Sequence, residues 1–248
     1  MRTFIINVGR DAADGFSGAA GGVAFLGEVC CGVALRHPEK LRWRFVWYYL
    51  ELCGRKSVPI VVYICFLMGV ILAFQAAVQL RNYGAELFVA DLLAFSVLKE
   101  LGPLMVAVIA TGRAGSSFAA EIGTMKVDEE INALRTMGIN PCRFLVVPKL
   151  LAMVVSLPLL TVIGDIMGLA GGLAVAVSYL GMPAGVYISR TFEVLRPDVL
   201  YMGVLKTVFF AVLITLVGCY RGFASSSDAQ GVGRAATLAV VNGILAVV

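Results

Sequence analysis

Long apolar runs separated by short charged segments set the pattern of this chain. A helix that crosses a bilayer needs roughly 20 mostly apolar residues. Runs that suit such helices occupy residues 58–79, 92–120, 144–179 and 199–220, and a last run begins at Ala235. The pattern predicts an all-α polytopic membrane protein with about five transmembrane helices. The last run is shorter than a full crossing, so we expect the final span to be truncated.

Composition supports the same class. Hydrophobic residues make up 60% of the chain and charged residues 15%, and the mean hydropathy is +0.90. The apolar share lies above, and the charged share below, the values typical of soluble domains. A bilayer is therefore the expected solvent for most of this chain.

The first part of the chain has a different character. We divide the sequence into an N-terminal cytoplasmic or interfacial segment, residues 1–57, and a transmembrane domain, residues 58–248. Charges at Arg10 and Asp14 exclude the apolar stretch of a signal peptide. A basic cluster is accompanied by interface-seeking aromatic residues, namely Trp43, Trp47, Tyr48 and Tyr49. An elbow helix in the headgroup layer is predicted, and for residues 1–20 a disordered cytoplasmic tail is the alternative.

Lysine and arginine positions indicate the topology. Before the first span lie Arg2, Arg10, Arg36, Lys40, Arg42, Arg44, Arg55 and Lys56. Further bases surround the loop between spans two and three and the loop after span four, whereas only Arg190 and Arg196 oppose this bias. The distribution places the N-terminus and both basic loops in the cytoplasm. All six cysteines then lie in the membrane or on its cytoplasmic side, without metal-binding spacing, and are expected to stay reduced.

The loop between the second and third spans carries a helical pattern over residues 126–137. Apolar residues fall on one face and charged or polar residues on the other, with Gly138 and Pro141 as a stop signal. So short a helix either lies on the parent protein or fits a partner's groove, and a solvated helix face is the simplest alternative. Its candidate contact residues are Lys126, Val127, Asp128, Glu129, Glu130, Ile131, Leu134 and Arg135.

Catalytic chemistry has little support in the sequence. The single histidine, His37, stands beside Pro38 in the basic stretch, and there is no metal-ligand cluster, nucleophile elbow or phosphate-binding loop motif. Glycine strings such as Gly164, Gly168 and Gly172 lie inside apolar runs, where they favour close helix packing. We therefore expect a non-enzymatic chain with no metal, no cofactor and no nucleic-acid partner.

One region carries a family resemblance. Residues 100–141, ELGPLMVAVIATGRAGSSFAAEIGTMKVDEEINALRTMGINP, and residues 156–172, SLPLLTVIGDIMGLAGG, resemble the MlaE/YrbE-type permeases. These are membrane subunits of bacterial ABC lipid transporters that work with MCE-domain proteins, and plant chloroplast homologues share the pattern. No sulphate-transporter-type regulatory domain precedes the elbow here, although some relatives have one.

The resemblance implies both an assembly and a function. The expected assembly is a permease homodimer in the bacterial inner membrane, bound to a cytoplasmic ABC ATPase dimer that holds ATP and Mg, and to an extracytoplasmic MCE-domain protein. The expected function is movement of phospholipid, or a related lipid, between the inner membrane and the MCE-domain protein. Residues 126–137 match the family's coupling helix, which docks on the ATPase. An ion-coupled secondary transporter is the alternative, and a lipid-modifying enzyme is a weaker one.

A homodimer that meets along the first two spans would enclose a lipid cavity. The first span ends with mostly apolar residues and a few polar ones, which suits acyl chains. Ordinary core packing or bilayer contact explains the same pattern. The candidate cavity residues are Leu72, Phe74, Gln75, Val78, Gln79 and Tyr83.

Two opposite charges lie inside predicted spans at matching depth. Counting at about 1.5 Å per residue, Glu100 and Lys206 both lie some 12 to 14 Å below the outer boundary. An unpaired charge there costs on the order of 2.5 to 3.5 kcal/mol, so both side chains should face the protein interior and pair. Lys99 should turn toward the outer interface instead. The pair either pins two helices together or rearranges beside the lipid cavity.

Overall fold

The computed structural model describes residues 43–248, and this part of the chain contains helices and no strands. Five helical segments within it are long and apolar enough to cross a membrane: Trp43–Arg81, Phe88–Val127, Cys142–Ser178, Pro197–Phe223 and Ala229–Val247. The predicted all-α polytopic membrane fold is confirmed. Most of the predicted N-terminal segment, with His37, Cys30 and Cys31, lies outside the described residues.

The first two spans are assembled from several helical pieces. The first consists of α2 (Trp43–Cys53), the 3-10 turn η2 (Arg55–Ser57) and α3 (Val58–Arg81). The second consists of α4 (Phe88–Ser96), the π-helical turn η3 (Val97–Leu101), α5 (Gly102–Ala110), the π-helical turn η4 (Thr111–Gly115) and α6 (Ser116–Val127).

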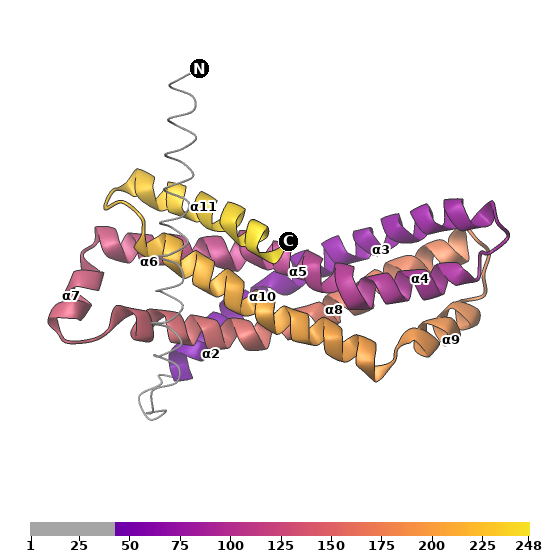
Figure 1. Cartoon of the computed structure of the whole chain (residues 1–248), viewed down its shortest axis with the longest axis horizontal. Coiled ribbons are helices and arrows are strands. Elements are labelled where there is room, and N and C mark those ends of the chain that lie inside the picture. Colours follow the sequence, from indigo (N-terminus) through magenta and orange to yellow (C-terminus); the bar gives the residue numbers. More distant parts are fainter. Residues whose placement is uncertain (1–42) are drawn as a thin grey trace, which may run out of the picture.

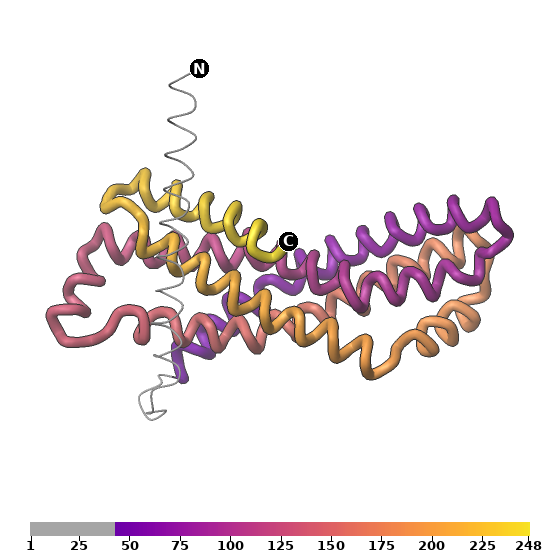
Figure 2. The backbone as a smooth tube through the Cα atoms, in the orientation of Figure 1, coloured from indigo at the N-terminus to yellow at the C-terminus, as the bar shows by residue number. Residues whose placement is uncertain are grey.

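The remaining spans follow a short helix. That short helix is α7 (Glu130–Thr136). The third span consists of the π-helical turn η5 (Cys142–Val146) and α8 (Val147–Ser178), the fourth is α10 (Pro197–Phe223) and the fifth is α11 (Ala229–Val247). Another short helix, α9 (Ala184–Val194), lies between the third and fourth spans. The helices form one elongated bundle, with α7 at one end and the α3–α4 and α8–α9 connections at the other (Figure 1). The tube in Figure 2 shows α6, α7 and α8 as a hairpin whose tip is α7.

Two apolar clusters hold the bundle together. The larger joins α2 to the middle and the α7 end of the bundle, through residues such as Tyr49, Phe118 and Leu157. The smaller lies toward the opposite end and includes Leu93 and Val175. Because Val46, Tyr49 and Cys53 are buried, α2 packs into the larger cluster, whereas its aromatic residues Trp43, Trp47 and Tyr48 are exposed.

Glycines allow two long helices, α3 and α8, to touch through their backbones. A Cβ atom at Gly69 would lie 1.9 Å from the carbonyl oxygen of Gly168. The helix-packing interpretation of the glycine string is therefore confirmed at Gly168. By contrast, a Cβ atom at Gly112 would meet no neighbouring atom within 4 Å, so packing does not require a glycine there.

One boundary prediction was wrong, and one helix was not predicted. The last span begins at Ala229 instead of Ala235, and its 19 residues are long enough to cross a membrane. The first turns of this helix, around Arg234, are polar, and for this reason the pattern of apolar runs did not predict them. The loop after the third span contains α9, which was not predicted. One face of this helix is buried, through Tyr187 and Thr191.

Candidate functional site

The predicted helix over residues 126–137 is two helices with a bend. The second span continues to Val127, and α7 begins only at Glu130. Glu129 adopts a left-handed conformation with φ of 59°, which ends the first helix, and the amide of Asn132 donates a hydrogen bond to its carboxylate. Gly138, with φ of 72°, follows the end of α7. The prediction of one continuous helix was wrong because it ignored this turn.

The two faces of this segment differ as the sequence pattern suggested. Ile131 is buried, and Val127 and Leu134 are half-buried against the parent protein. The exposed face carries Asp128, Glu129, Glu130, Asn132 and Arg135. The apolar stripe thus packs on its own chain and leaves the charged face open to a partner.

Lys126 differs from the other residues predicted to contact a partner. Its ammonium donates a hydrogen bond of 3.0 Å to the carbonyl oxygen of Phe223 and another to that of Ser225. These carbonyls lie at the C-terminal end of α10, where a helix has unpaired acceptors and attracts cations. Lys126 therefore fixes the base of the α7 tip to α10, and its charge does not face outward.

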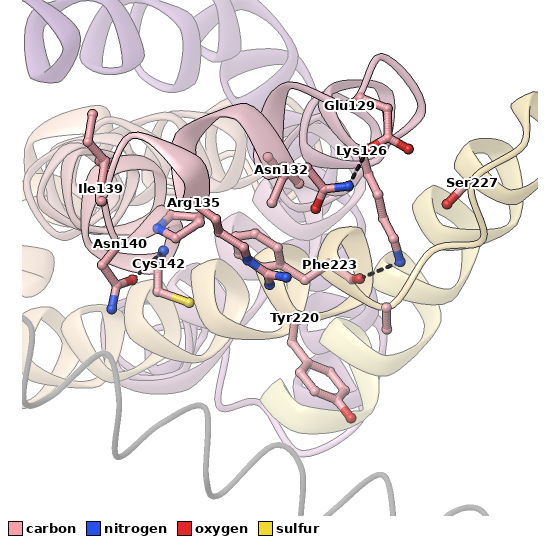
Figure 3. A pocket seen from close by; sticks show the side chains of 14 residues that line it. Lys126, Glu129, Asn132, Arg135, Ile139, Asn140, Cys142, Tyr220, Phe223 and Ser227 are labelled. Carbon is pink, nitrogen blue, oxygen red and sulfur yellow. Dashed lines mark hydrogen bonds between the residues drawn. The ribbon is translucent and has the colours of Figure 1, made fainter.

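A cavity of about 870 Å³ opens between α7 and the end of α10 (Figure 3). Ile131 and Phe223 supply apolar parts of its wall, and the side chain of Arg135 points into it. Within residues 43–248 the Arg135 guanidinium has no ion-pair or hydrogen-bond partner. The α7 tip therefore presents both exposed carboxylates and an available guanidinium.

A second opening, a groove of about 470 Å³, lies on the C-terminal half of α3. Its lining residues are Val70, Ile71, Phe74, Gln75, Val78 and Gln79. The structure thus places four of the predicted cavity residues, Phe74, Gln75, Val78 and Gln79, around one groove.

The other two predicted cavity residues lie elsewhere. Leu72 is half-buried and packs against the smaller apolar cluster, although it lies seven residues, about two helical turns, before Gln79 and so at the edge of the groove face. Tyr83 lies beyond the end of α3 and is 85% exposed.

The predicted contact between Glu100 and Lys206 is present. The Lys206 ammonium lies 2.6 Å from the Glu100 carboxylate and 3.3 Å from the carbonyl oxygen of Lys99. That carbonyl lacks its usual helical partner because Pro103, four residues on, has no N–H group. Lys206 therefore pairs with the charge of Glu100 and also donates to the Lys99 carbonyl, which has no N–H partner four residues on.

The surroundings of this pair differ from the prediction. The side chains of Glu100 and Lys206 are 59% and 37% exposed, so the expectation that both face the interior of the chain was wrong. They meet where η3 and α10 touch at the surface of the bundle. The Lys99 ammonium lies 4.8 Å from the ring centre of Phe95, one turn nearer the N-terminal end of the second span. That Lys99 faces the outer interface stays a prediction.

A charge cluster near the α7 end, formed by a fully buried lysine and a half-buried glutamate, was missed. The Lys149 side chain is fully buried, and its ammonium lies 3.2 Å from the Glu121 carboxylate. Tyr49 donates a hydrogen bond of 2.5 Å to the same carboxylate. The sequence analysis assigned Lys149 to the basic residues around the loop between spans two and three. Glu121 and Lys149 lie at similar distances from the ends of the two spans that flank this loop, and that comparison would have predicted their pairing.

Asp165 is a further buried acid that the sequence reasoning did not single out. It is 7% exposed, and its Oδ1 atom has no hydrogen-bond partner among the described residues. A Cβ atom at Gly102 would lie 1.8 Å from this oxygen, so the carboxyl packs directly on the backbone of α5. Residues 43–248 contain no group of three His, Cys, Asp or Glu side chains placed to hold a metal ion.

Comparison with known proteins agrees with this architecture. The model of the family "Permease MlaE" matches residues 46–248. A probable ABC transporter permease protein of Rickettsia prowazekii is 39% identical over 76% of this chain and 73% of its own length. The intermembrane phospholipid transport system permease protein MlaE of Haemophilus influenzae is 30% identical over 98% of this chain and 93% of its own.

A plant relative is more distant. The chloroplastic protein TRIGALACTOSYLDIACYLGLYCEROL 1 of Arabidopsis thaliana is 28% identical over 84% of this chain and 59% of its own length. The family match covers the five spans, the α7 tip and the α3 groove. This multi-pass membrane protein belongs to the MlaE permease family.

Proposed function

We propose that this chain is the permease subunit of an ABC transporter that moves phospholipid, or a related lipid, between the inner membrane and an extracytoplasmic MCE-domain protein. The observation that carries the proposal is the α3 groove, whose mostly apolar wall with two glutamines suits acyl chains. The name of the Haemophilus relative, which is that of a phospholipid transport permease, supports the choice of cargo.

In this proposal the α7 tip faces the cytoplasm and docks on a separate ATPase, which binds ATP and Mg. The distribution of basic residues supports this orientation, with the N-terminus also cytoplasmic. The exposed carboxylates of Asp128, Glu129 and Glu130 would meet basic groups of the ATPase, and Arg135 an acidic one. The permease itself contributes no catalytic group.

A homodimer completes the proposed site. A single subunit leaves the Glu100–Lys206 pair and the α3 groove open at its surface. Ion pairs exposed to hydrocarbon are costly, so a second copy or a water-filled cavity between two copies should cover them. This arrangement would place the groove of each subunit on a shared lipid path.

The alternative of an ion-coupled secondary transporter is favoured by one observation, the buried Asp165 carboxyl without a partner among the described residues. Reconstitution separates the two functions. The permease, its ATPase and its MCE-domain protein are placed in proteoliposomes, and transfer of a fluorescent phospholipid is followed with and without ATP. We expect transfer only with ATP and Mg. Transfer driven by a proton or sodium gradient in the absence of the ATPase would support the alternative.

A further inference from the structure

The cluster of Tyr49, Glu121 and Lys149 joins three helices at one carboxylate. The Tyr49 hydroxyl contacts one oxygen of Glu121 at 2.5 Å, and the Lys149 ammonium lies 3.2 Å from the other. The same ammonium lies 5.2 Å from the ring centre of Tyr49 and 5.4 Å from that of Phe118. The two rings meet edge to face, with centres 6.0 Å apart, and enclose the lysine.

These residues come from elements with distinct positions in the bundle. Glu121 and Phe118 belong to α6 and Lys149 to α8, which are the two arms of the hairpin that carries α7 (Figure 2). Tyr49 belongs to α2, which leads through η2 into α3, the helix that forms the lipid groove. The cluster thus connects both arms of the hairpin to the segment that continues into the groove.

Stability alone does not account for an ionic cluster at this position. Well-packed apolar side chains of similar size commonly hold helices together as firmly as a buried ion pair does. The Lys149 ammonium also makes no hydrogen bond of good geometry among the described residues, so its donors are incompletely satisfied. The charged groups instead tie the two arms to each other: the Lys149 side chain is fully buried and Glu121 is 35% exposed, so a shift of Glu121 away from Lys149 would leave a buried ammonium unpaired.

We propose that Tyr49, Glu121 and Lys149 are positioning residues that make α2 move with the α6–α7–α8 hairpin. A displacement of α7 by the ATPase is then passed through Glu121 to Tyr49, and along α2 and η2 to the groove on α3. The inference rests on the proposed function, since only a docked ATPase would displace α7.

The test uses the complete transporter with Tyr49→Phe. This change removes one hydroxyl and keeps the ring that packs against Lys149. Tyr48→Phe is the matched control, because Tyr48 is the neighbouring residue on the same helix and is 59% exposed. We expect Tyr49→Phe to assemble and hydrolyse ATP normally, while lipid transferred per ATP falls by about fivefold or more, as for loss of a typical coupling. Tyr48→Phe should match the wild type.

A second variant separates coupling from folding. The double substitution Glu121→Leu with Lys149→Met removes both charges and leaves no unpaired one. We expect this protein to assemble with its ATPase and to show the same fall in lipid transferred per ATP. Wild-type transfer per ATP in both Tyr49→Phe and the double variant would overturn the inference. Absence of ATP-dependent transfer in the wild-type complex would instead overturn the proposed function.

Discussion

At the residue scale, Lys206 illustrates how a membrane protein uses one charge for two acceptors. Its ammonium pairs with Glu100 and also approaches the carbonyl of Lys99, which Pro103 leaves without a helical donor. In hydrocarbon an unpaired carbonyl and an unpaired charge are both costly. Lys206 therefore stabilises the π-helical turn η3 as well as the contact between two spans.

The Glu100–Lys206 pair can be tested by charge reversal. Glu100→Lys or Lys206→Glu alone should impair insertion or lipid transport, because each leaves two like charges within the membrane. The double reversal should recover part of the loss. Protein yield in membranes and lipid transfer in proteoliposomes measure the two effects.

The matched control lies at the start of α10, the helix that carries Lys206, where Arg196 and Asp198 form an exposed pair. Reversal of either residue should change little, since exposed ion pairs contribute about 0 to 1 kcal/mol. Full activity of both single reversals at Glu100 and Lys206 would show that the contact has no role in insertion or transport.

A buried glycine gives a second prediction at this scale. Gly69→Ala would place a methyl group 1.9 Å from the Gly168 carbonyl oxygen, so α3 and α8 would have to separate. A cost of about 1 to 3 kcal/mol is expected for such overpacking. The melting temperature of the purified protein in detergent should fall, whereas Gly112→Ala, at a position without close neighbours, should leave it nearly unchanged.

At the scale of elements, α7 packs against the rest of the chain on one face and is exposed on the other. Ile131 anchors its inner face, and Lys126 ties the preceding turn to the end of α10. The acidic residues at its start are free of the core. A docked partner would therefore move α7 together with its supports.

The acidic face of the α7 tip supplies the corresponding prediction. Replacement of Glu129 and Glu130 by lysine should reduce copurification of the ATPase or uncouple ATP hydrolysis from lipid transfer, since both carboxylates would face basic groups of the partner. The permease should still fold in the membrane. Glu193→Lys on α9 is the control, because that residue is exposed at the opposite end of the bundle. Unchanged copurification together with unchanged lipid-stimulated ATPase activity would contradict the prediction.

At the scale of the whole molecule, the bundle separates the α7 tip from the α3 groove along its length (Figure 1). In the proposed function, a displacement of the α7 tip by the ATPase has to reach the α3 groove at the other end of the bundle. The first span, 39 residues made of α2, η2 and α3, reaches from the Tyr49 cluster to the groove. It is therefore the element through which the two ends can communicate.

The position of the lipid path is testable by photo-crosslinking in the intact transporter. Crosslinkers at Gln75, Val78 and Gln79 should capture phospholipid during transport, because these residues line the groove. Leu72 should capture little, since it packs against the smaller cluster. Ile166 on α8, which is 60% exposed on the single subunit, controls for ordinary bilayer contact. Equal capture at Ile166 and in the groove, with no dependence on ATP, would contradict a lipid path there.

Local patterns were sufficient for much of this fold. Apolar runs determined the five spans, and the alternation of apolar and acidic residues after Val127 determined which face of α7 is exposed. Equal depth in two spans was enough to pair Glu100 with Lys206. Each of these features depends on residues close in sequence or on a distance that helical rise converts directly into depth.

Features that depend on how helices pack were decided by the tertiary structure. Periodicity did not separate Leu72 from the groove face, and it did not reveal that Glu100 lies at the surface of the bundle. Periodicity also did not predict the contacts of Tyr49 and Lys149 with Glu121. A hydropathy pattern records how apolar each residue is, whereas burial and ion pairing depend on which neighbouring helix covers it, and that contact forms only when distant segments pack together.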